Sequence, residues 1–258
     1  PTTMAEGFDQ ALARIDSLAD DPKLQVDLWD DFGEIRAGQG RFDESKALFE
    51  KALAQAERIY PEGHPVIAEA LVNRRVIAAY AGDSLEGAPY TERAVAILDV
   101  PGTTHLKELS NALQALAGVR EAQGRRDEVL AIMERVVAIT RQMQPVDDLT
   151  LGLSLFNHAT AVFNAGRIDE SEPLTAEAIA VTRRAVGDHA PNLMTMLNLK
   201  SEIDYRKGRL AEAVATNEQQ LAIARHNFPN AHPWTARALT DVGFNRIEAG
   251  DYARGIVE

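Results

Sequence analysis

Few side chains in this chain stand at the spacings that catalysis or metal binding requires. The six histidines form no His-Glu-x-x-His pattern and no pair four residues apart, and the chain has no cysteine. Asp31, Phe32 and Gly33 match a magnesium-binding triplet of phosphoryl-transfer enzymes, but the glycine-rich loop, strand lysine and catalytic loop that work with it are missing. No Gly-x-Ser-x-Gly, Walker or dinucleotide-binding motif occurs. We therefore expect no catalytic residue, no metal and no cofactor in this chain.

The elements that position the remaining side chains follow a 42-residue period. Its marker is a turn glycine that returns six times in one phase: Gly40, Gly82, Gly124, Gly166, Gly208 and Gly250. Six copies in phase predict a tandem array of one supersecondary unit. Glycine suits the end of a helix, where the chain takes a positive φ that costs a side chain about 1 kcal/mol.

The residues around each glycine predict two helices. A large residue stands eleven positions before the glycine and, in five copies, a small one stands seven before it, the spacing that close helix approach needs. The large residues are Trp29, Leu71, Leu113, Leu155, Leu197 and Leu239, and the small ones are Gly33, Ala117, Ala159, Ser201 and Gly243. After five of the glycines an acid stands at the fourth position, and a mostly small residue follows it at the fifth. We expect helix A, a tight turn, helix B and a short connection, with helices near 24–38 and 42–60 in the first copy.

This unit resembles the tetratricopeptide repeat, whose signature is represented in the fourth copy by Leu155, Ala159, Gly166, Ser171 and Ala178. The standard unit has about 34 residues, and HEAT repeats of about 40–47 residues are the alternative architecture. The long spacing, with His64-Pro65 and His232-Pro233 before helix A, resembles the repeats of kinesin light chains. The resemblance implies an all-α fold, a right-handed α-solenoid. We expect a capping helix in residues 1–23 and about six repeats in 24–258, the last one incomplete.

Two local features refine this expectation. Pro89 falls where helix B of the second copy should run, so that helix is expected to begin late, near Gly87. His64, His189 and His232 occupy equivalent connections, and we expect a structural role for them, such as a hydrogen bond at a helix N-terminus.

The entry into the array resembles that of bacterial receptor-like serine/threonine kinases. Arg14-Ile15-Asp16 matches one helix of that family, and Leu28, Gly33, Glu34 and Ile35 match the next. The resemblance implies a kinase domain ahead of the repeats in the full-length protein. It leaves the location open between cytoplasmic and extracytoplasmic (periplasmic).

Composition limits the partners. The net charge of −12, from 27 basic and 39 acidic residues, disfavours nucleic acid, which needs basic stripes. No apolar run reaches the length of about 18 residues that a membrane span needs, so we expect no direct membrane insertion of this chain.

By analogy with the family, helix A lines a concave groove. Its N-terminal end carries the acids Asp27, Asp30 and Glu34, which either attract a basic segment or form a solvated face. Its C-terminal half is aromatic, and the residues expected to bind a ligand are Phe156, Phe163, Asn198, Tyr205, Arg237 and Phe244. In this interpretation Asn198 holds a peptide backbone and Arg237 meets a carboxylate. Alternatively, the aromatics pack between neighbouring A helices.

The sequence thus predicts a non-catalytic module that binds a protein or peptide, as the sensor or docking part of a larger signalling protein such as a kinase. Two alternatives remain: a structural solenoid that forms a homo-oligomer, and the peptide-binding regulatory domain of a transcription factor.

Overall fold

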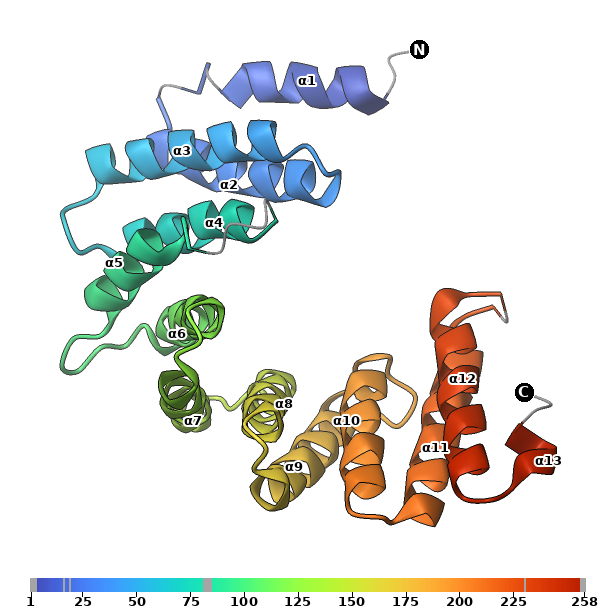
Figure 1. The fold of residues 1–258 in the computed structure, drawn as a ribbon. Helices are drawn as coiled ribbons and strands as arrows, with labels where there is room; N and C mark the ends of the chain where they lie inside the picture. Colours follow the sequence, from blue (N-terminus) through green and yellow to red (C-terminus); the bar gives the residue numbers. More distant parts are fainter. Residues whose placement is uncertain (1–3, 16, 19, 81–84, 230, 256–258) are drawn as a thin grey trace. The chain divides into compact units, whose positions relative to one another are not determined.

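A computed structural model describes residues 4–15, 17–18, 20–80, 85–229 and 231–255. Every regular element in these ranges is an α-helix (Figure 1), which confirms the predicted all-α fold of repeated helix pairs. The helices are α1 (Met4–Ile15), α2 (Pro22–Gly38), α3 (Phe42–Ile59), α4 (Pro65–Tyr80), α5 (Ala88–Leu98), α6 (Leu106–Ala122), α7 (Arg126–Gln142), α8 (Asp148–Asn164), α9 (Ile168–Val186), α10 (Asn192–Arg206), α11 (Leu210–Asn227), α12 (Pro233–Glu248) and α13 (Tyr252–Gly255). Among the helices described, none is both long and apolar enough to cross a membrane.

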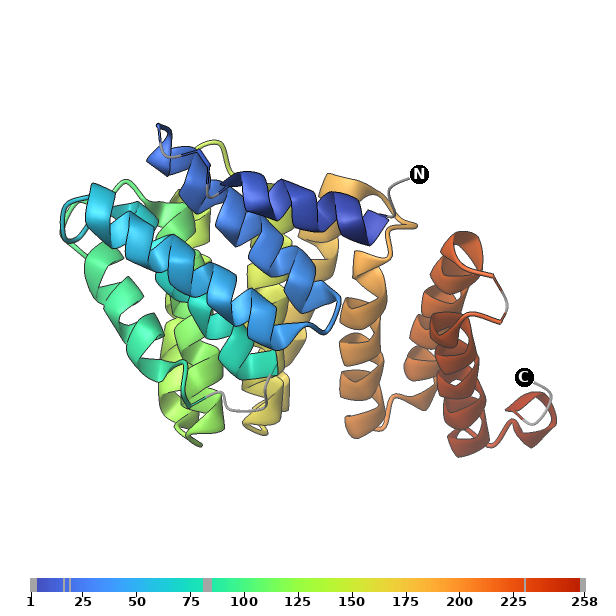
Figure 2. The ribbon, with the colours of Figure 1, turned by 90° about the horizontal axis from the view of Figure 1, so that it is seen from above.

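The chain divides into two compact units, Pro1–Ile132 and Met133–Glu258. Within the first unit each of α2 to α5 packs on the next helix; within the second the same holds from α8 to α13 (Figures 1 and 2). Within each of these two runs, helices that are adjacent in the sequence are therefore adjacent in space, as a tandem array requires.

The turn glycines have the backbone conformation that the sequence predicts. Gly40, Gly124, Gly166, Gly208 and Gly250 have φ between 72° and 86°, and each follows the end of an A helix. Gly82 lies outside the described residues. A side chain at these positions would be strained because L-residues rarely adopt positive φ.

A hydrogen bond between the two helices of a copy explains why small residues stand seven positions before and five positions after the turn glycine. In α8 and α9, Leu155 and Ala159 are fully buried, and the Ser171 hydroxyl donates to the Ala159 carbonyl at 2.8 Å. The first copy repeats the bond between Ser45 and the Gly33 carbonyl at 2.6 Å.

The fifth copy reverses this bond: the hydroxyl stands on helix A, and Ser201 donates to the Ala213 carbonyl at 3.2 Å. Small residues bring the two helices close enough for a hydroxyl on one to reach a carbonyl of the other in all three copies.

The acid four positions after the glycine serves as an ion-pair partner. Glu44 meets Arg36 at 3.2 Å and Arg41 at 2.5 Å, so it joins the end of α2 to the start of α3. Glu128 meets Arg120 and Arg125 at the same two distances. In these two copies the acid thus pairs with arginines on both sides of the turn, a partnership that the glycine pattern alone does not reveal.

The second copy departs from the pattern as expected. Helix α5 begins at Ala88 with Pro89 in its first turn, where a missing N–H costs no helical hydrogen bond, so the late start is confirmed. The buried Arg74 of α4 forms ion pairs with Glu50 at 3.0 Å and Glu86 at 3.3 Å. Its guanidinium also lies 5.0 Å from the ring centroid of Tyr90.

Two connection histidines have the predicted structural role. His64 Nδ1 accepts from the Val66 amide at 3.3 Å, and His232 Nδ1 accepts from the Trp234 amide at 3.2 Å. Both rings also stack on the aromatic residue four positions earlier. His189 differs, because it stacks on His226 at 4.7 Å between ring centroids.

Candidate functional site

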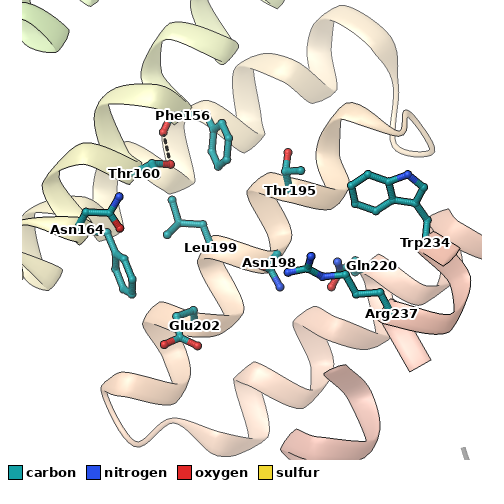
Figure 3. Close-up of a pocket in the computed structure, with 11 residues that line it drawn as sticks. Phe156, Thr160, Asn164, Thr195, Asn198, Leu199, Glu202, Gln220, Trp234 and Arg237 are labelled. Atoms are coloured by element: carbon teal, nitrogen blue, oxygen red, sulfur yellow. Dashed lines mark hydrogen bonds between the residues drawn. The ribbon is translucent and has the colours of Figure 1, made fainter. Parts of the chain in front are cut away.

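A pocket of about 330 Å³ lies within the second unit (Figure 3). Its walls come from three successive A helices, α8, α10 and α12, and α11 contributes one residue. This volume is at the lower end of the range for ligand pockets. The lining residues are Phe156, Thr160, Phe163, Asn164, Thr195, Asn198, Leu199, Glu202, Gln220, Trp234 and Arg237.

The pocket brings together four of the six residues that the sequence nominated: Phe156, Phe163, Asn198 and Arg237. Tyr205 and Phe244 do not line it. These two pair with each other instead, with ring centroids 5.8 Å apart, and Phe244 is 53% exposed. The nominated set therefore divides into a pocket group and an aromatic pair outside the pocket.

The apolar wall also belongs to the core. Phe156 and Phe163 pack against the buried cluster of Ala159, Leu199 and Ile203 while they line the pocket. The binding and packing interpretations of these aromatics are thus compatible. At the other end, Trp234 is 42% exposed and supplies an aromatic face from α12.

Polar groups without hydrogen-bonding neighbours face this apolar wall. In the described part of the chain, the side chains of Asn198 and Arg237 make no hydrogen bond, whereas Glu202 pairs with Arg206 at 2.8 Å. The Arg237 guanidinium points toward Asn198 in Figure 3. Burial raises the pKa of Asp241, and the charge of Arg237, one turn earlier on α12, acts in the opposite direction. Arg237 can therefore bind a carboxylate in a bidentate manner.

Seven lining residues were not among the nominated binding residues: Thr160, Asn164, Thr195, Leu199, Glu202, Gln220 and Trp234. Gln220 carried a readable signal. It stands twelve positions after its glycine, where Ala52, Ala94 and Ala178 occupy the same place in other copies. A long polar residue at a position where the other copies have alanine or valine indicates that it serves the pocket rather than the packing of the repeat.

The predicted acidic group lies in the first unit. The pKa of Asp30 is raised to about 7. Burial is the largest cause, a hydrogen bond from Asn73 opposes it, and the charges of Glu69, Glu34 and Asp27 add to it. Burial also raises the pKa of Glu69, together with repulsion from Glu108. The hollow beside Glu69 and Glu108 measures about 70 Å³. Among the described residues no group of three potential ligands could hold a metal ion.

Comparisons with known proteins address the fold. Sequence models of the tetratricopeptide repeat match residues 37–66 and 112–146. The chain is similar to RxLR effector protein SFI4 of Phytophthora infestans (strain T30-4), with 23% identity over 241 residues that cover 90% of this chain and 70% of that protein.

Solved structures show the same architecture. A putative kinesin light chain from Podosopora anserina, with nearly identical repeats, matches with a TM-score of 0.65 and 19% identity, over 79% of this chain and 97% of that one. A Rap protein complexed with Competence and Sporulation Factor matches with a TM-score of 0.63 and 12% identity, over 94% of this chain and 76% of that one.

The repeats of this family mediate protein–protein interaction. The two matched segments, the repeated helix pairs and the structural neighbours together show that this chain carries tetratricopeptide repeats and has the fold of such repeat arrays, the kinesin-light-chain-like structures among them.

Proposed function

We propose that the second unit binds an extended peptide segment of a partner protein in the pocket between α8, α10 and α12. The observation that carries this proposal is the convergence of Asn198, a half-buried amide without a hydrogen bond to any described residue, and the exposed guanidinium of Arg237 on an aromatic wall formed by another repeat. A protein surface that serves only packing would pair the half-buried amide of Asn198.

Each side chain has a role that follows from its chemistry. Asn198 offers both a donor and an acceptor, which suits the N–H and C=O of an extended backbone. Arg237 recognises a carboxylate of the peptide. Phe156, Phe163 and Trp234 cover an apolar side chain, since aromatic residues contribute much of the energy at interfaces. The Rap protein solved with Competence and Sporulation Factor supports a ligand-binding use of this fold.

Affinity capture with crosslinking tests the proposal. Wild-type chain should retain a partner that Arg237→Ala and the double variant Phe156→Ala/Asn198→Ala lose. Arg225→Ala is the matched control, because Arg225 is an exposed arginine on α11 that does not line the pocket. Circular dichroism must show intact helicity in each variant. Equal retention by wild type and the pocket variants would refute the site.

A more specific proposal concerns the larger protein to which this module belongs. We infer that the module is the sensor or docking part of a larger signalling protein, and the serine/threonine kinase setting rests on the resemblance of residues 11–35 alone. The coding sequence upstream of Pro1 tests it: kinase motifs support this setting, and a helix-turn-helix motif would favour the transcription-factor alternative.

One observation favours self-association as a second function. Phe244, Ile247 and Tyr252 lie close in sequence at the end of the second unit, and all three are exposed. Exposed apolar residues that gather on one surface often mark an interface. A molar mass that rises with protein concentration, and falls to that of the monomer in Phe244→Ser/Tyr252→Ser, would support it.

A further inference from the structure

The most informative unexplained group in the pocket is the carboxamide of Gln220. The residue is 2% exposed, yet it lines the pocket, where Figure 3 shows it in the same region as Asn198 and Arg237. Its Oε1 is buried and accepts no hydrogen bond from any of the residues that the structure describes. Leaving a buried acceptor without a hydrogen bond lowers the stability of the folded protein, because the oxygen has lost its hydration.

The repeat pattern shows that the fold itself does not need this glutamine. The equivalent positions hold Ala52, Ala94, Val136 and Ala178, and each of these is fully buried. A small apolar residue therefore satisfies the packing of helix B. Glutamine at this place introduces a desolvated amide that packing alone does not explain.

The content of the pocket determines how the acceptor is satisfied. In the unliganded protein a cavity of this size admits water, which reaches Oε1 when the Gln220 side chain turns toward the pocket, because Oε1 itself has almost no accessible surface. A ligand that displaces this water must supply a donor in its place or lose the hydrogen bond. The apolar wall alone would not discriminate between an apolar side chain and one that carries a donor, whereas a buried acceptor does.

We propose that Gln220 is a specificity-determining residue: its Oε1 accepts a hydrogen bond from an O–H or N–H at the end of the peptide side chain that enters the pocket. This inference rests on the proposed function, and it adds the chemical class of the occupant. A donor-bearing side chain should bind about ten- to a hundredfold more tightly than an apolar side chain of similar size.

A random peptide library displayed on phage tests the inference with the full chain as bait. Wild type should enrich donor-bearing residues at one peptide position and an acidic residue, opposite Arg237, at another. Gln220→Leu should shift the first position to leucine, methionine or phenylalanine and leave the acidic preference unchanged. Gln220→Glu keeps the acceptor and adds charge, so it should retain the donor requirement and favour lysine or arginine.

Asn217→Leu is the matched control. Asn217 is equally buried one turn earlier on α11, but it does not line the pocket, and its amide donates to the Asp241 carbonyl at 3.0 Å. This variant should lose stability and keep the wild-type peptide preferences. Thermal unfolding by circular dichroism shows which variants are folded at the selection temperature, and Gln220→Glu provides a second test if Gln220→Leu is not.

The outcomes separate the two proposals. Enrichment that is identical in wild type, Gln220→Leu and Gln220→Glu would overturn the role of Gln220 and leave the peptide-binding function standing. Failure of folded wild type to enrich any peptide would overturn the proposed function and, with it, this inference.

Discussion

Replacing Asp30 by asparagine should stabilise the first unit at neutral and alkaline pH and have little effect in acid. The folded protein raises the pKa of this carboxyl from 3.8 to about 7, chiefly through burial. One pKa unit corresponds to about 1.4 kcal/mol, so ionising Asp30 costs the folded state about 4 kcal/mol relative to the unfolded chain.

The sign follows from proton binding. Between pH 3.8 and about 7 the folded state retains a proton that the unfolded state has lost, so stability falls as pH rises through this window and is level above it. Asparagine cannot ionise and can still accept the hydrogen bond from Asn73. The advantage of Asp30→Asn over wild type should therefore grow by about 3 kcal/mol between pH 5 and pH 8.

Urea unfolding followed by tryptophan fluorescence measures this difference. The chain has two tryptophans, so a Trp234→Phe background leaves Trp29, which adjoins Asp30, as the reporter of the first unit. Asp31→Asn is the control, because Asp31 is exposed at the next position. If the gap between Asp30→Asn and wild type is the same at pH 5 and pH 8, the raised pKa and the reasoning from burial are wrong.

Three further predictions address the repeat itself. Leu155→Ala and Leu197→Ala remove almost fully buried side chains and should each cost about 2–5 kcal/mol in chemical denaturation; if both are neutral, the assigned helix phase is wrong. Gly33→Ala places a Cβ 2.7 Å from Phe49 Cε1, so it should lower the midpoint of thermal unfolding, and Phe49→Leu in the same chain should recover part of the loss. Gly166→Ala imposes a side chain at φ 81° and should cost about 1 kcal/mol, whereas Gly38→Ala, in open space within α2, should not destabilise and serves as its control.

The fold was predictable because its signal is local and repeated. Each copy presents the same glycine and, in most copies, the same large and small residues, so departures such as Pro89 stand out, and helix α5 begins where that proline allows. The positions of Leu155 and Ala159 on α8 followed from helical periodicity, and both are fully buried.

The candidate site was only partly predictable, because it depends on which helices meet. Phe156, Phe163, Asn198 and Arg237, nominated by their register on helix A, line the pocket, whereas Tyr205 and Phe244, nominated by the same register, lie outside it. Gln220 belongs to helix B, which the analogy assigns to packing, so only its contrast with alanine in other copies could have identified it.

The reversed hydroxyl bond of the fifth copy restricts how these repeats can be recombined. Joining helix A of the fourth copy to helix B of the fifth would place Ala159 against Ala213 and leave no hydroxyl, whereas the opposite hybrid would place Ser201 against Ser171 and crowd two. Exchange between the fourth and fifth copies therefore preserves the bond when the chain is cut between helix pairs and loses it when the chain is cut at the glycine turn. For these two copies the exchangeable unit is the whole helix pair, so a library of shuffled repeats that includes the fifth copy should have its junctions in the connections that precede helix A.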